Sequence, residues 1–172
     1  MKYGMFSACC VALLAATAQA HDGRVYVSGS INNNTCTLSP DSQAIAVDMG
    51  TVSNRQFLHP GEGGAWQPFA INLQDCGSTA SGVTVEFSGT ESENNPDLLA
   101  LNAEAGHATG VSIALYDGAK NAIPLAAKSA VVPLIGGQSS VHLQFYARYI
   151  ADGGTVSTGT ANASATFILN YE

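Results

Sequence analysis

Residues 141–148, Val-His-Leu-Gln-Phe-Tyr-Ala-Arg, alternate between side chains suited to a protein core and side chains suited to a surface. Residues 163–171, Ala-Ser-Ala-Thr-Phe-Ile-Leu-Asn-Tyr, repeat this period, with two alanines, Phe, Leu and Tyr on one parity. A period of two is typical of a β-strand that packs one face on a core. Between the two segments, Asp152-Gly153-Gly154 favours a turn. These two segments therefore predict the last two strands of a β-sheet protein.

The same alternation continues toward the N-terminus, and no run of ten or more residues has helical periodicity. Asp117-Gly118 predicts a hairpin turn, and 98–101, Leu-Leu-Ala-Leu, predicts one short helical turn. Cys76 lies on the opposite parity to Phe69, which predicts a bulge or strand end between them. Short strands joined by turns indicate an all-β, immunoglobulin-like sandwich. Further strands are expected at 24–31, 36–38, 45–47, 66–76, 83–87, 111–115, 123–125 and 131–135.

The composition describes an acidic, weakly charged chain. Of 172 residues, 46% are hydrophobic and 11% charged, and the formal net charge is −7. This balance excludes a disordered chain and leaves room for a real core. Nucleic-acid binding needs Lys and Arg side chains to neutralise phosphates, so we expect no nucleic-acid partner for this acidic chain.

The first twenty residues have the features of a secretory signal. Lys2 precedes an apolar stretch over 5–18, and Ala18-Gln19-Ala20 is the small-x-small pattern of a cleavage site. The apolar stretch is shorter than the roughly 20 residues that span a bilayer. We therefore predict a cleaved signal peptide at 1–20, no membrane anchor, and a mature chain of 152 residues.

Cleavage would remove Cys9 and Cys10 and leave Cys36 and Cys76. Two cysteines in an exported chain favour one disulfide, here between residues 40 positions apart. In the chain-entropy model, such a bond stabilises the fold by roughly 4 kcal/mol.

Nothing in the sequence indicates an enzyme, a metal site or a cofactor. The histidines have no ligand spacing with one another or with the cysteines, and no nucleophile elbow, phosphate loop or His-Glu-x-x-His is present. His142 alternates with core positions, so it is expected on the outer face of its strand. Glu91 and Glu93 are expected to be solvated charges, and Trp66 belongs in the core or at its rim more readily than in a receptor contact.

Four features together resemble the structural pilins of chaperone-usher (type 1 fimbrial) pili, over the whole mature sequence. The first is an alternating segment at 25–31, with a central glycine, ahead of Cys36, and the second is the segment 68–75 ahead of Cys76. The third is the motif Phe-Tyr-Ala-Arg-Tyr at 145–149. The fourth is the C-terminus, where 163–172 has a penultimate tyrosine and a glycine, Gly159, stands fourteenth from the end.

The resemblance implies an incomplete sandwich of six strands whose last strand ends at Tyr171. Without a seventh strand, the fold has an apolar groove and unpaired backbone groups along its edge. Donor-strand complementation of pilins, in which another chain lends the missing strand, supplies both hydrogen bonds and side chains. The resemblance therefore implies a periplasmic chaperone, an outer-membrane usher and neighbouring pilins as partners, in a fimbrium on the bacterial surface that contributes to adhesion.

It also implies a role for particular residues. Residues 21–33 would be the donor extension and 34–172 the pilin domain. Val25, Val27 and Ile31 would enter a neighbour's groove, with Gly29 where the neighbour leaves no room for a side chain. Five residues are expected to line this chain's own groove or to contact the chaperone, namely Gly159, Phe167, Leu169, Tyr171 and Glu172. Glu172 would make its contact through its carboxylate.

Some alternatives stay open. Residues 25–31 could instead form a first strand of their own domain, and the protein could be a single-domain receptor- or carbohydrate-binding protein at the tip. Tip adhesins in these systems resemble two-domain chains, for which 152 residues leave no room. Among structural subunits, the short extension favours a minor or adaptor subunit over the major one, and a terminator role is not excluded.

Overall fold

The computed structural model describes residues 24–172. The predicted signal peptide lies outside the described residues. The chain divides after Ile31, and residues 32–172 form one folded unit. Residues 24–31 have no regular secondary structure, so the strand predicted there is not formed in the isolated chain.

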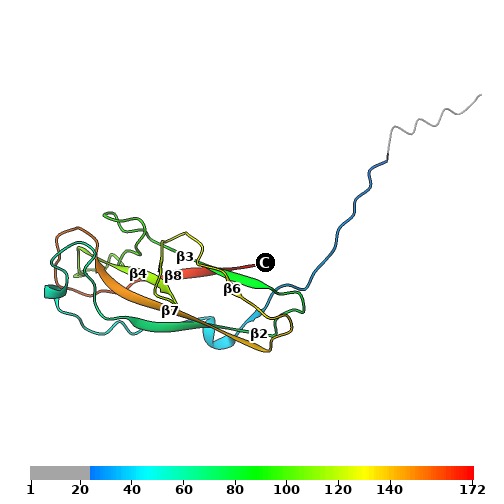
Figure 1. The fold of residues 1–172 in the computed structure, drawn as a ribbon. Helices are drawn as coiled ribbons and strands as arrows, with labels where there is room; N and C mark the ends of the chain where they lie inside the picture. Colours follow the sequence, from blue (N-terminus) through cyan, green and yellow to red (C-terminus); the bar gives the residue numbers. More distant parts are fainter. Residues whose placement is uncertain (1–23) are drawn as a thin grey trace, which may run out of the picture. The chain divides into compact units, whose positions relative to one another are not determined.

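Two antiparallel sheets make up the folded unit (Figure 1). In the larger sheet, the order is β1 (Thr37–Leu38), β2 (Gln67–Gln74), β7 (Ser140–Ala151), β4 (Val111–Asp117), β5 (Ala122–Ile123). The smaller sheet has the order β6 (Val132–Pro133), β3 (Gly82–Gly89), β8 (Ala165–Tyr171). Two short 3₁₀ turns, η1 (Pro40–Ser42) and η2 (Asn54–Gln56), are the only helical elements of residues 24–172, and neither could cross a membrane. The all-β immunoglobulin-like prediction is thus confirmed.

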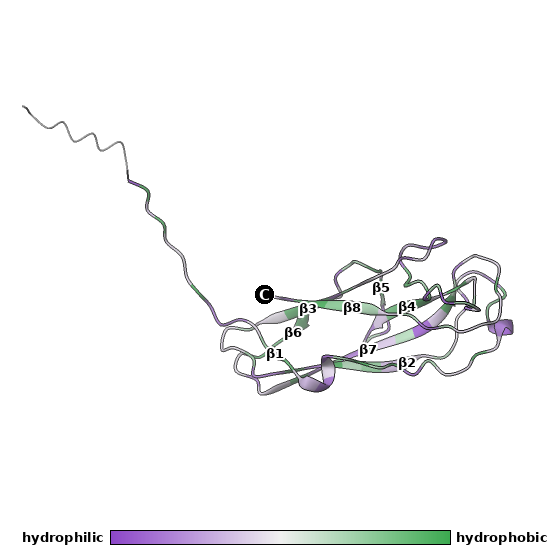
Figure 2. Cartoon of the chain, turned by 180° about the vertical axis from the view of Figure 1, so that it is seen from behind, coloured by the Kyte–Doolittle hydropathy of each residue, from purple (hydrophilic) through white to green (hydrophobic). Residues whose placement is uncertain are grey.

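The core lies between the two sheets, and hydrophobic residues occur along the strands of both (Figure 2). Inward side chains of β2, β3 and β7 are almost completely buried, namely Ile71, Leu73, Val83, Val85, Leu143 and Phe145. The Phe145 ring contacts Phe87 of the opposite sheet edge-to-face, with ring centroids 5.3 Å apart, and stacks on Phe69 at 5.6 Å. These aromatic contacts join the two layers.

The strand end predicted before Cys76 is present. β2 stops at Gln74, and Asp75 adopts a φ of +50°, which turns the chain out of the strand. Cys76 then forms the predicted disulfide with Cys36. Beside it, the amide N–H of Gly77 donates to the carbonyl of Thr35 at 2.8 Å, so the start of the folded unit is held against the end of β2.

The helical turn predicted at 98–101 is wrong. Leu99 exchanges backbone hydrogen bonds of 2.9 and 2.8 Å with Ile113, so this segment is extended. In an extended chain, neighbouring side chains point to opposite faces. Leu99 accordingly enters the main core, whereas Leu98 packs on Ala114 and Ile150 outside the larger sheet. Consecutive apolar residues occur at 98–99 because this extended segment is buried on both of its faces.

The prediction of a short strand at 45–47 is also wrong, because this segment pairs with no other strand in the described part of the chain. Burial does alternate, because Ile45, Val47 and Met49 are half-buried between exposed neighbours. No backbone-to-backbone hydrogen bond, however, involves residues 44–49 within the described part of the chain. The segment is extended in pattern and lacks a partner strand.

Candidate functional site

An apolar groove of about 760 Å³ opens along one edge of the sandwich. Its walls come from residues 43–50 on one side and 161–167 on the other, and Leu38 contributes at one end. The floor is made of core side chains from both sheets, namely Phe69, Phe87, Leu99, Ile113, Leu115, Ala147 and Tyr149. The groove therefore exposes part of the hydrophobic core.

Backbone groups are unpaired along both walls. β8 is the edge strand of the smaller sheet and pairs only with β3, from Val83 opposite Tyr171 to Gly89 opposite Ala165. Across the groove, residues 44–49 have no backbone partner in the described chain. Edge strands of this length are usually protected by charges, bulges or a covering segment. Here the unprotected edges face each other across an apolar gap.

Both walls have a period of two. Ile45, Val47 and Met49 point inward on one side, and on the other the half-buried residues are Ala161, Ala163 and Phe167. A groove with this repeat on both walls accommodates an extended segment that presents alternate apolar side chains. It offers no charged or catalytic group at its floor.

Tyr149, in the groove floor, holds one wall of the groove in place. Its hydroxyl donates to the carbonyl of Ala161 at 2.6 Å and thereby holds the segment before β8 against β7. Burial, together with the nearby Asp48 carboxylate, raises the pKa of Tyr149 above its ordinary value. The phenol thus stays neutral and donates its hydrogen bond throughout the physiological range.

The groove residues expected from the sequence lie in three different places. Phe167 lines the groove, and its ring lies 6.5 Å from that of Phe87. Leu169 and Tyr171 pack against the core cluster, with the Tyr171 hydroxyl donating to the carbonyl of Cys36 at 3.2 Å. Gly159 lies against residues 106–108, where a Cβ would overlap backbone atoms. Close backbone approach therefore accounts for this glycine.

The end of the chain is held by the start of β3. The carbonyl oxygen of Glu172 accepts a hydrogen bond from the Ser81 hydroxyl at 2.9 Å, and its amide donates to Gly82 at 3.0 Å. The Glu172 side chain is exposed. Its expected contact with a chaperone is a proposal taken up below.

The wall at 43–50 was not assigned to the site from the sequence. The signal was present, since Ile45, Val47 and Met49 alternate with smaller or polar residues. This pattern predicts a strand equally well. Only the unpaired backbone and the neighbouring pocket show that the segment borders an empty space.

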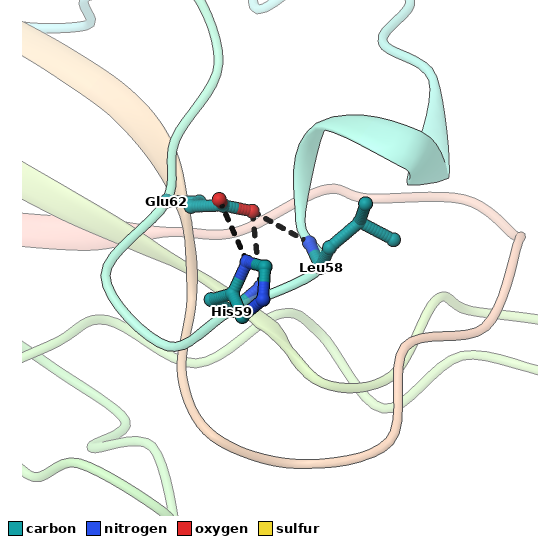
Figure 3. Close-up of polar contacts among 3 residues, drawn as sticks. All are labelled: Leu58, His59 and Glu62. Carbon is teal, nitrogen blue, oxygen red and sulfur yellow. Dashed lines mark hydrogen bonds and ion pairs between the residues drawn. The ribbon is translucent and has the colours of Figure 1, made fainter.

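Histidine and carboxylate contacts outside the groove have structural explanations. Glu62 accepts hydrogen bonds from the amides of Leu58 (2.8 Å) and His59 (3.0 Å), and pairs with the His59 ring at 2.9 Å (Figure 3). The hydrogen bonds from His59 hold the pKa of Glu62 below its usual range. His142 is exposed on the outer face of β7, as predicted, and contacts Asn72 at 2.8 Å.

Comparisons with known proteins agree with this fold. A family model described as "Fimbrial protein" matches residues 25–172. The "Uncharacterized fimbrial-like protein YcbV" of Escherichia coli K12 is 44% identical over 153 residues, covering 89% of this chain and 88% of that protein. The "Probable major fimbrial subunit LpfA" of Escherichia coli O157:H7 is 36% identical over 176 residues, covering 100% and 98%.

Among solved structures, the P pilus rod subunit PapA superimposes with a TM-score of 0.67 at 23% identity, covering 80% of this chain and 99% of that one. At this identity the likeness shows the fold alone. The fold defines an all-β protein of the immunoglobulin-like sandwich class, with an apolar groove along one edge. The family match is more specific, and the chain belongs to the fimbrial protein family of chaperone-usher pilus subunits. Members of this family are structural subunits and not enzymes.

Proposed function

We propose that this chain is a structural subunit that polymerises by donor-strand exchange. The groove receives the extension of a neighbouring subunit, and the extension of this chain fills the groove of another. The observation that carries the proposal is the combination of a groove with two unpaired walls and an exposed alternating segment in one chain.

Residues 24–31 have the properties of such a donor. Val25, Val27 and Ile31 are 90%, 92% and 103% exposed, an unfavourable state for apolar side chains. They lie on one parity, as do the inward residues of the groove walls. Seven residues in extended conformation span roughly 23 Å, the reach of a strand as long as β8. Gly29 shares their parity. We propose that it lies where the core of the neighbouring subunit leaves no room for a side chain.

The remaining steps of export are part of this proposal. Residues 1–20 direct the chain to the periplasm, where a chaperone covers the groove until the usher mediates exchange. Phe167, Leu169 and Tyr171 belong to the strand that the chaperone would contact, and the Glu172 carboxylate would meet basic residues. Two observations support this: β8 has an open edge, and the side chain of Glu172 is exposed. The mature subunit then resides in a surface fimbrium and contributes to adhesion.

A synthetic peptide of residues 22–33 tests the groove directly. Added to the chaperone-free subunit, it is expected to raise the melting temperature, because a ligand that binds only the folded state stabilises it. At a concentration hundredfold above its Kd, the gain is about 2.7 kcal/mol, or roughly 5–10 °C for a domain of this size. The measurement is a thermal melt followed by circular dichroism.

The matched control is a peptide of identical composition in which each apolar residue is exchanged with its neighbour. A shift of one position turns every apolar side chain to the opposite face of a strand. Equal stabilisation by both peptides, or by neither, contradicts the proposal.

The position in the fibre remains a prediction. The short extension favours a minor or adaptor subunit, whereas one full-length relative is named a probable major subunit. Quantitative mass spectrometry of sheared fimbriae separates these readings. For an adaptor, we expect this chain at a few per cent or less of the most abundant pilin, and a near-stoichiometric amount contradicts that assignment.

A further inference from the structure

A cluster of aromatic and cationic side chains covers the outer face of the larger sheet. The Trp66 ring contacts Tyr116 edge-to-face, with centroids 4.5 Å apart, and Tyr146 at 6.1 Å. Lys120 Nζ lies 4.9 Å and the Arg148 guanidinium carbon 4.7 Å from the centroid of the Trp66 ring. We call these five residues the cationic patch. Cation–π contacts of this kind hold both charges in place.

Neither cation of the patch is neutralised within residues 24–172. The ion pair of this part of the chain joins His59 and Glu62 and includes neither cation. Arg148 Nε is buried without a hydrogen-bond partner among the described residues. The carboxylate of Asp117 accepts instead from the amides of Ala119 and Asn121, at 2.9 and 2.8 Å. Two of the six Lys and Arg residues of an acidic chain are thus gathered here without a counter-charge.

An acidic loop over residues 91–97 projects beside the patch. Glu91, Glu93 and Asp97 are exposed, and none forms an ion pair within the described chain. The loop is held in place by Asp152, whose carboxylate accepts hydrogen bonds from Ser92 (3.2 Å) and Asn94 (3.0 Å). It therefore presents its three charges on an ordered backbone.

The patch and the acidic loop lie on the same face of the sheet. Leu98, which ends the loop, packs on Ala114 and Ile150, and Tyr116 of the patch packs against this cluster. Ala114 is also the cross-strand partner of Arg148. Two copies can meet through the outer faces of their larger sheets. In that arrangement, the acidic loop of each copy lies on the cationic patch of the other. Such a reciprocal contact closes on itself as a two-fold interface.

We propose that this face pairs with the same face of a second copy of this chain, and that the contact joins neighbouring fimbriae side by side. The proposal rests on the proposed function and requires this chain to recur along the fibre, which is the near-stoichiometric outcome of the mass-spectrometry measurement above. A single exposed ion pair is weak, yet a repeated contact between two fibres gains from its high effective concentration. The carboxylates of one copy then supply the counter-charges that the patch of the other lacks.

Charge reversal in assembled fimbriae tests the contact. At low salt, wild-type fibres are expected to sediment as bundles at low speed, and Lys120→Glu is expected to reduce the sedimented fraction at least fivefold. Glu93→Lys should do the same. The matched control is Lys128→Glu, an exposed lysine beside β3 in the other sheet. Salt at 1 M, where charges are screened beyond about 3 Å, should dissolve wild-type bundles.

Mixing the two kinds of variant fibre identifies the partner. When Lys120→Glu fibres meet Glu93→Lys fibres, both contacts of the two-fold interface again join opposite charges, so bundling should return. Wild-type fibres that stay single, unchanged bundling by Lys120→Glu, or failure of the mixture to bundle overturns the proposal. SDS-resistant polymers, which report donor-strand exchange, are measured in a separate assay. If the wild-type chain forms none, the proposed function is contradicted and not the contact between fibres.

Discussion

A chain without residues 21–32 is expected to fold, to bind a chaperone and to accept a donor, but never to enter another subunit. Its own domain should lose little stability, because the apolar side chains of the deleted segment are exposed. The deletion stops before Asn33, whose carbonyl accepts hydrogen bonds from the amide (3.2 Å) and hydroxyl (2.8 Å) of Thr79. The expected readout is that the deleted chain alone forms no SDS-resistant polymers, and that in a mixture with wild type it occupies only one end of each polymer and shortens the polymers.

Two substituted chains separate the role of the side chains from that of length. Serine at Val25, Val27 and Ile31 removes the apolar parity and should reproduce the deletion. Alanine at Tyr26, Ser28 and Ser30 changes the opposite parity to a similar extent and should leave polymerisation near wild type. If the deleted chain alone still forms SDS-resistant polymers, residues 21–32 are not the donor.

The layers of the fold could be predicted because their pattern is local. Alternation in 66–76, 83–87, 111–115 and 141–148 placed the long strands, and the side chains predicted to point inward are buried or half-buried. In 111–115 the opposite face is buried as well, at Ser112 and Ala114. The disulfide was predictable from cysteine count once export was inferred. These predictions depend on period and composition, which a single sequence contains.

The groove could not be located in the same way, because it is defined by an absent neighbour. Residues 44–49 alternate like a strand, and only pairing distinguishes a strand from the wall of an empty groove. Gly159 was assigned to the groove by resemblance, but the backbone of 106–108 accounts for it here. The four apolar residues at 98–101 were ambiguous because periodicity does not separate a buried turn from a segment buried on both faces.

Filling the groove from its own wall is expected to block assembly without unfolding the subunit. Ala163 lies half-buried in the wall before β8 and lines the groove, so the ring of Ala163→Phe can turn into the groove and rest on the core side chains of its floor. A donor strand must then displace that ring or overpack against it.

Overpacking of this kind costs roughly 1–3 kcal/mol, equal to about 5- to 150-fold in affinity. We therefore expect binding of the 22–33 peptide to weaken by that factor and SDS-resistant polymers to decline in parallel, while the melting temperature of the free subunit is unchanged or slightly raised. The control is Ile168→Phe, because Ile168 is 52% exposed and is not part of the groove lining. It adds a ring to the same wall on its other face. Equal loss of peptide binding in both variants would show that the groove between β8 and residues 43–50 is not where the donor binds, since only one of the two rings can reach it.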